Sequence, residues 1–349
     1  MRHPTQTTLR HSALKDKREL PTMRRRKVIG WGSLALLTLG NGNLSLAQET
    51  YPARTIRLVV PLPAGSPLDV VGRRFAQQLS TNLGVPVIID NKPGAALTIG
   101  AAEVARASPD GYTLLMTVAE PLVSAVAVMK IPYDPQRDFK LISKIAVSTA
   151  GPILIASNAT SANDLSELVR DAKAFSTPIT YASFGPGSFP QQIMESLAKQ
   201  TGTKFTEVPY KGSPPALQDV LAGQVNLAFS SVETVAPLFT SGKIKAIAVV
   251  DKHPLYPRIQ TFVEAGFTDF VFRNKPWIGL AAPSRTPDAV VQKLAAAAKS
   301  ISIDSNFRKF LEEFGFSPIG NSPAEFADEY RKEMAVVPPL IKSLGVNPE

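Results

Sequence analysis

The stretch that decides the fold is RLVVPLPAGSPLDVVGR, residues 57–73. It begins as an apolar run typical of a buried strand, breaks at prolines and a glycine, and resumes with the apolar spacing of a helix. Such a helix start carries unpaired N–H groups and about half a positive charge, so it can hold a carboxylate or phosphate. Turns of this kind also start helices that bind nothing, so the turn alone does not decide function.

The alternation of short apolar runs with helical periods continues along the chain. We predict strands over residues 56–60, 85–89, 112–117, 153–156, 179–183, 204–208, 226–229, 246–250 and 277–282. Helices are predicted over residues 68–83, 99–107, 165–175, 287–300, 306–314 and 323–344. Strands separated by helices favour βαβ units and parallel sheets covered on both faces. We therefore expect an α/β protein with two lobes: residues 48–150 plus 252–349 in lobe 1, and residues 151–251 in lobe 2.

Residues 1–47 have the pattern of a signal peptide. Basic residues 24–27 precede an apolar stretch, 28–40, and Ser45-Leu46-Ala47 is a small-x-small cleavage pattern. Met23 gives a signal of normal length, so translation is expected to begin there. The adjacent arginines allow either the general or the twin-arginine export route. The apolar stretch is short for a membrane span, although an uncleaved anchor is the alternative. We expect a periplasmic protein.

Composition excludes several classes of protein. Nine of the 38 basic and two of the 29 acidic residues lie in residues 1–47, so the remainder carries a net charge of only +2. No basic block remains that is typical of nucleic-acid binding. The chain has no cysteine, and His253 is the only histidine after the signal, so we expect no metal site and no cofactor. No nucleophile, phosphate-loop or dinucleotide motif is present, and we expect no enzymatic activity.

Five segments in order resemble the Bug-type periplasmic solute-binding proteins of tripartite tricarboxylate transporters. They are YPARTIRLVVPLPAGSPLDVVGR, ASPDGYTLLM, IPYDPQRDF, VPYKGSPPALQDVLAGQVNLAF and SGKIKAIAVV. The resemblance implies a two-lobed, type II-like periplasmic binding protein with a ligand cleft between the lobes. It also implies a small organic carboxylate as ligand, transporter membrane subunits as partners, and a monomer.

The resemblance implies that two loops and two strand ends hold the carboxylate through amides and hydroxyls. The expected ligand-binding residues are Pro63, Ala64, Gly65, Ser66, Asp69, Thr117, Ser183, Gly185, Gly187, Ser188 and Ser230. The chain departs from the family pattern at Leu68, where a hydroxyl is usual, and at the apolar Phe189. These changes favour a ligand with one carboxylate and a less polar body. The alternative is that both side chains pack inside their own lobes.

Some further polar residues have open roles. Glu120 would favour an ammonium or amide on the ligand if it faced the cleft, but we expect it to face solvent. Ser213 is expected to cap a helix, and Arg273 and Lys275 are expected to be surface charges. Two other functions stay open: a receptor of the same fold that presents its ligand to a sensor kinase, and a hydrolase that uses two carboxylates. The identity of the carboxylate does not follow from the sequence.

Overall fold

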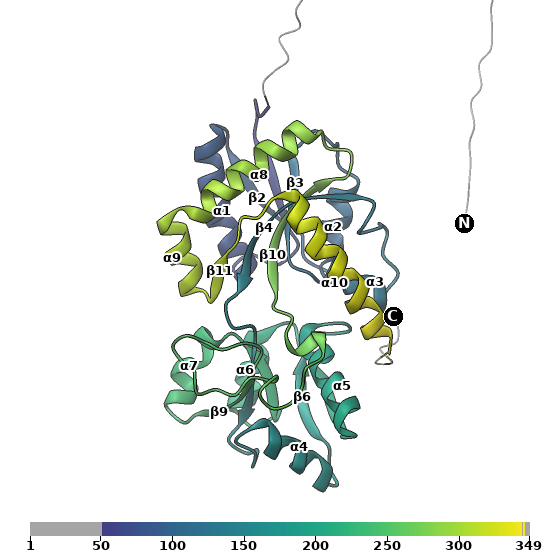
Figure 1. The fold of residues 1–349 in the computed structure, drawn as a ribbon, viewed down its shortest axis with the longest axis vertical. Coiled ribbons are helices and arrows are strands. Elements are labelled where there is room, and N and C mark those ends of the chain that lie inside the picture. Colours follow the sequence, from purple (N-terminus) through teal and green to yellow (C-terminus); the bar gives the residue numbers. More distant parts are fainter. Residues whose placement is uncertain (1–50, 344, 346–349) are drawn as a thin grey trace, which may run out of the picture. The chain divides into compact units, whose positions relative to one another are not determined.

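The computed structural model describes residues 51–343 and 345. The predicted signal peptide and the start at Met23 lie outside these residues. The elements gather around two sheets (Figure 1). We name the six-stranded sheet and its helices lobe 1, and the five-stranded sheet and its helices lobe 2. None of the described helices is long and apolar enough to span a membrane.

Lobe 1 is built from both ends of the described chain. Its strand order is β11-β4-β10-β3-β1-β2. The N-terminal elements are β1 (Ile56–Val60), α1 (Pro67–Leu83), β2 (Val87–Asn91), α2 (Thr98–Ala105), β3 (Thr113–Thr117), α3 (Ala125–Val128) and β4 (Phe139–Ser148). The C-terminal elements are β10 (Trp277–Pro283), α8 (Asp288–Ile303), α9 (Ser305–Glu313), β11 (Phe316–Pro318) and α10 (Pro323–Ser343).

Lobe 2 comes from the middle of the chain, with strand order β7-β6-β8-β5-β9. Its elements are β5 (Ile153–Ser157), α4 (Leu165–Ala174), β6 (Ile179–Ser183), α5 (Phe189–Thr201), β7 (Phe205–Pro209), α6 (Ser213–Leu221), β8 (Leu227–Ser230), α7 (Val232–Thr240), β9 (Ile244–Val249) and the 3-10 helix η1 (Phe270–Phe272). Phe262 and Phe272 pack into the core of this lobe. The lobe boundaries stay a prediction, and this packing favours a return to lobe 1 after residue 272 rather than at 252.

Both faces of each sheet are apolar, as the sequence predicts. Along β1, Ile56 and Leu58 pack in the cluster that includes α1, α8 and α9, whereas Val59 packs with α2, α3 and α10 on the other face. Along β5, Leu154 and Ile155 likewise belong to clusters on opposite faces. The period of two along a strand therefore buries the apolar side chains of these strands on both faces, because helices cover both faces, whereas Arg57 of β1 is half-buried.

The prediction of parallel sheets is wrong, because both sheets are mixed. β1, β2 and β3 are parallel, but β10 lies antiparallel between β3 and β4. In lobe 2, β5 is antiparallel to β8 and β9. The sequence reading also missed the ten-residue strand β4. The physical reason is the route of the chain: β5 and β10 each enter a lobe from the other one, so they start where the βαβ strands end.

Candidate functional site

Strand pairing brings the predicted site loops to the edges where the chain crosses between lobes. Thr117, at the end of β3, pairs with Gly279 near the start of β10. Ser230, at the end of β8, pairs with Ile153 at the start of β5. Because β1 runs parallel to β3, and β6 runs parallel to β8, the loops after all four strands lie at these crossing edges. This is the edge of an α/β sheet at which ligands usually bind.

The loop between β1 and α1 is shaped by Asp69. This side chain is 2% exposed. Its carboxylate accepts hydrogen bonds from the Gly65 N–H, from Arg73 Nε and from Asn91 Nδ2, each at 2.9 Å. Burial opposes ionisation, but these hydrogen bonds outweigh it and hold the pKa of Asp69 below its usual range. Asp69 therefore positions the loop and has little surface left for a ligand.

The rest of this loop presents its backbone outward. Pro63, Ala64 and Gly65 are exposed, and Gly65 has a φ of 82°, which favours glycine. Ser66 is the N-cap of α1, and its hydroxyl accepts from the Asp69 N–H at 3.3 Å. Within the described residues, the N–H groups of Ala64 and Leu68 have no protein acceptor. These two amides are the donors that the first loop can offer.

The loop between β6 and α5 is held by a second carboxylate, Glu207. Glu207 accepts from the hydroxyl of Ser183 and from Gln191 Nε2, the latter at 2.8 Å. Gln191 in turn accepts from the Gly187 N–H at 2.7 Å. Ser183 is fully buried, so its hydroxyl supports the loop and is not available to a ligand. The sequence reading missed Gln191 and Glu207, the residues that rigidify this loop.

The start of α5 offers donors like those of α1. Ser188 is the N-cap residue, and its buried hydroxyl accepts from the Phe184 N–H at 3.2 Å. Gly185 and Gly187 have φ values of 99° and 71°. Among the described residues, the Phe189 N–H has no protein acceptor. The loop glycines therefore turn the backbone, while the first amide of the helix stays unpaired.

The two remaining predicted contacts are buried. Thr117 is fully buried, and its hydroxyl donates to the Val118 carbonyl at 3.1 Å. Ser230 is 6% exposed and lies 3.3 Å from the hydroxyl of Ser213. Ser213 is the first residue of α6 rather than its cap, which is Gly212, so the capping prediction is wrong. Both strand-end hydroxyls support the edges of the sheets.

A small pocket lies where α5 of lobe 2 meets lobe 1. Its volume is about 20 Å³. It is lined by Ala119, Glu120, Ser124, Phe189, Gln192, Asn274, Pro276, Glu333 and Val337. None of the eleven predicted site residues is in this lining. Gln192 spans the junction, since its Nε2 donates to the hydroxyl of Ser124 at 3.3 Å and to the Gly187 carbonyl at 2.8 Å.

Two carboxylates, those of Glu120 and Glu333, line this pocket and give it an acidic character that the sequence did not predict. Glu120 was expected to face solvent, but it is half-buried and lines the pocket. Burial raises the pKa of Glu120, and the nearby charge of Glu333 raises it further. Burial also raises the pKa of Glu333, despite hydrogen bonds from Trp277 Nε1 at 2.8 Å and Asn274 Nδ2 at 3.3 Å. No local sequence pattern marks Glu333, Gln192 or Asn274.

The apolar substitutions have different roles. Leu68 is 2% exposed and belongs to the lobe 1 core, so its part in an apolar ligand contact is ruled out. Phe189 packs edge-on against Phe229, with ring centroids 6.1 Å apart, and also lines the pocket between the lobes. Lys275, which precedes β10, forms an ion pair with Asp251, which follows β9, at 2.9 Å. Of the two aromatic or apolar candidates, only Phe189 reaches the junction.

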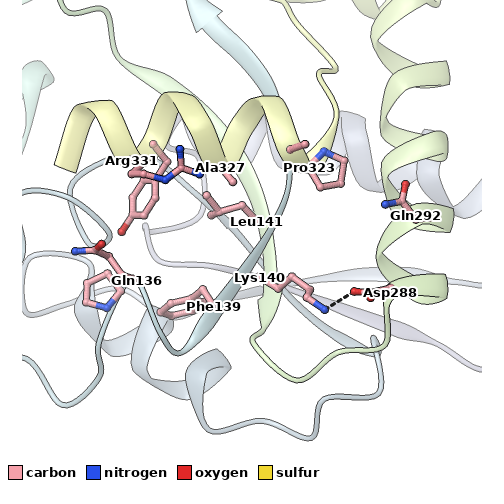
Figure 2. A pocket seen from close by; sticks show the side chains of 12 residues that line it. Gln136, Phe139, Lys140, Leu141, Asp288, Gln292, Pro323, Ala327 and Arg331 are labelled. Atoms are coloured by element: carbon pink, nitrogen blue, oxygen red, sulfur yellow. Dashed lines mark hydrogen bonds and ion pairs between the residues drawn. The ribbon is translucent and has the colours of Figure 1, made fainter. Parts of the chain in front are cut away.

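A larger pocket lies elsewhere, on lobe 1 between β4, α8 and α10 (Figure 2). This groove of about 600 Å³ includes Lys140 and Arg331. Lys140 is paired with Asp288 at 2.6 Å (Figure 2), and Arg331 is paired with Asp328 at 2.9 Å. Lys140 and Arg331 are thus already neutralised, and the groove contains none of the loops described above.

In the described part of the chain, no group of three or more His, Cys, Asp or Glu side chains is arranged so that it could hold a metal ion. His253 is 5% exposed, and its Nε2 lies 3.1 Å from Glu233. It stacks near Tyr256, with ring centroids 5.3 Å apart. The histidine is therefore part of the packing of lobe 2.

The chain is similar to several known proteins. The model of the tripartite tricarboxylate transporter family receptor matches residues 71–346. The periplasmic binding protein BugD is 32% identical, with a TM-score of 0.74, over 86% of this chain and 100% of that one. MatC of Rhodopseudomonas palustris, solved with bound malate, is 30% identical, with a TM-score of 0.73, over 83% and 100%. Rpa4515 of R. palustris, solved with adipate, is 28% identical, with a TM-score of 0.76, over 86% and 100%.

Proposed function

Because the chain belongs to the receptor family of the tripartite tricarboxylate transporters, a family of periplasmic solute-binding proteins, we propose that it captures a small organic carboxylate between its lobes. In this proposal the ligand is then delivered to the membrane subunits of a transporter. The protein works in the periplasm as a monomer and carries out no chemical conversion. The division into lobes is part of the same proposal, with the first crossing at residue 151 and the return after residue 272 rather than at 252.

One observation carries the proposal: each lobe offers a helix start whose first amide is unpaired and whose loop is already rigid. In lobe 1, Asp69 holds the loop so that the Ala64 and Leu68 N–H groups are left without an acceptor. In lobe 2, Glu207 and Gln191 hold the loop while the Phe189 N–H stays unpaired. A pre-formed loop loses little entropy when a ligand binds, which favours affinity.

The free amides supply a large part of the binding energy without an arginine in the loops. Micromolar affinity requires about −8 kcal/mol. Hydrogen bonds to a charged group contribute about 1.5–3 kcal/mol each, and a helix N-terminus adds about 0.3–1 kcal/mol. Three free amides and two helix ends therefore supply about 5–11 kcal/mol before the entropic cost of association, and contacts to the rest of the ligand offset that cost. The malate and adipate bound by two similar proteins support a carboxylate as the ligand class.

Native mass spectrometry of the protein purified from periplasm, followed by calorimetry, tests the proposal. We expect one small acid per chain to co-purify, and malate, adipate or a related acid to bind with a stoichiometry of one. The helix-start donors predict that methyl esters of the same acids bind far more weakly. Failure of every carboxylate to bind or to raise the melting temperature would reject the proposed function.

A further inference from the structure

The pocket between the lobes contains a carboxylate without a side-chain partner. Glu120 comes from the loop after β3, and its carboxylate accepts from its own backbone N–H but, among the described residues, takes no hydrogen bond from another side chain. The lining of the pocket contains no lysine, arginine or histidine. Buried carboxylates are almost always paired or hydrogen-bonded, because removing an unpaired charge from water is costly. An unpaired Glu120 at this position calls for a partner that the chain does not supply.

Most of the other polar groups in the pocket also present acceptors, the exception being Asn274, whose Nδ2 donates to Glu333. Gln192 is 7% exposed, and its Oε1 accepts no hydrogen bond within the described residues, while its Nε2 is already occupied. The Ser124 oxygen accepts from Gln192. Glu333 keeps its negative field in the pocket although Trp277 and Asn274 donate to it. A lining of acceptors is complementary to a group that brings hydrogen-bond donors, and it repels a carboxylate.

Phe189 links this pocket to the carboxylate-binding end of α5. It is the first residue of that helix, so its free N–H lies at the helix start, and the residue also lines the pocket. The face of an aromatic ring attracts a cation, and more strongly where water is excluded. The volume of about 20 Å³ leaves room for about one water molecule or one small charged group. An anion site and an acceptor-rich pocket thus adjoin at one residue.

We propose that Glu120, together with Gln192 and Phe189, binds a cationic nitrogen of the ligand, so that the ligand is a carboxylate that also carries an ammonium group. This inference rests on the proposed function, in which the helix starts hold the carboxylate end. Glu120 is then the residue that sets specificity, because it selects against a second carboxylate. The raised pKa of Glu120 agrees with this role, since a bound cation would relieve the repulsion from Glu333.

Matched pairs of ligands test the inference by calorimetry at neutral pH. Adipate and 6-aminohexanoate are chains of similar length that differ in one end group, a carboxylate or an ammonium; succinate and 4-aminobutyrate form a shorter pair. For the wild-type protein we expect at least one amino acid to bind about tenfold or more tightly than its dicarboxylate partner, a difference of about 1.4 kcal/mol.

The variant Glu120→Gln keeps the shape of the side chain and removes its charge. We expect it to lower the ratio of amino-acid to dicarboxylate affinity by about tenfold or more. Glu313→Gln, on the exposed surface of α9, removes the same charge outside the pocket and should leave the ratio unchanged. Circular dichroism and the melting temperature verify that both variants are folded.

Two results would overturn the inference, and they differ from a failure of the proposed function. If the dicarboxylate of each pair binds wild-type protein equally well or better, Glu120 does not select a cation. The same follows if Glu120→Gln leaves the ratio unchanged. In both cases the dicarboxylates still bind, so the carboxylate receptor stands. If none of the four compounds binds and no other acid does, the proposed function fails together with the inference. The wild-type ratio is decisive even if a variant does not fold.

Discussion

At the scale of single residues, Asp69 acts on the ligand through the loop that it holds. Replacing it with alanine leaves the Gly65 N–H without its acceptor and removes one of the two hydrogen bonds that Asn91 Nδ2 donates, the other being to the Leu62 carbonyl. We expect Asp69→Ala to cost about 1–3 kcal/mol in the free energy of unfolding, measured by urea denaturation, and to weaken carboxylate binding. Asp328→Ala, at an exposed pair on α10, is the matched control and should cost less than about 1 kcal/mol.

The same carboxylate gives a pH dependence of defined sign. The pKa of Asp69 is lower in the folded protein than the ordinary aspartate value of 3.8. The unfolded chain therefore binds more protons in acid, and the stability that Asp69 contributes is present above the unfolded pKa and is lost as the pH falls through the folded pKa. The difference between wild type and Asp69→Asn should shrink below about pH 4. A difference that stays constant down to pH 2 would contradict this role.

Glu120 shows the opposite linkage. Burial raises its pKa in the folded protein above the ordinary glutamate value of 4.5, so the native state binds more protons and loses stability as the pH rises past that value. In the absence of ligand, Glu120→Gln should therefore raise the melting temperature at pH 7, by roughly 2–4 °C for on the order of 1 kcal/mol. The gain should vanish near pH 4. Differential scanning fluorimetry across pH measures it, and a variant less stable than wild type at pH 7 would refute an unpaired Glu120.

At the scale of elements, the start of α5 lies against lobe 1, where Gln192 donates to Ser124. Gly187 has a φ of 71°, and an added Cβ would lie 2.9 Å from Val128 Cγ1. Gly202, at the other end of α5, has a φ of 67° with nothing within 4 Å of an added Cβ. Gly187→Ala and Gly202→Ala should thus share a backbone cost of about 1 kcal/mol. Only Gly187→Ala should also weaken ligand binding, as calorimetry would show; equal affinities would exclude a role for this contact.

Local pattern explains which elements the sequence predicts well. Strands 56–60 and 179–183 have the predicted bounds, because continuous apolar runs between turn residues give an unambiguous signal. The strand over residues 139–148 was missed because half-buried Lys140 and Lys144 interrupt its apolar pattern. The antiparallel places of β5 and β10 follow from how the chain crosses between lobes, which no local window contains.

The candidate site also has one part that local sequence predicts and another part that depends on the fold. The turn residues from Pro63 to Ser66 and from Gly185 to Ser188 are found from their own chemistry, since glycines and serines mark helix starts. Which hydroxyls are free is decided elsewhere: Ser183 is taken by Glu207, on a neighbouring strand. Glu120 and Glu333 meet only through the fold. Sequence therefore predicts where a ligand can bind better than it predicts which side chains select it.

At the scale of the whole molecule, the proposed function requires the lobes to separate at the start of α5 when a ligand enters. The structure offers a direct test, because an added Cβ on Gly187 would lie 3.7 Å from the Cβ of Ser124. This spacing is close to the mean of about 3.8 Å found in disulfides, and the chain contains no other cysteine. The double variant Ser124→Cys, Gly187→Cys should therefore form a disulfide that joins α5 of lobe 2 to lobe 1.

We expect the oxidised double variant to take up a carboxylate far more slowly than the reduced one, because the linked lobes cannot part around the cleft. Stopped-flow fluorescence of Trp277, which lies beside the pocket through its bond to Glu333, can follow the binding. The comparison is made within one variant, so the strain of a side chain at Gly187 affects both states alike. Each single-cysteine variant should respond to oxidant no more than wild type does. Equal rates in the oxidised and reduced states would show that ligands enter without separation of the lobes at this contact.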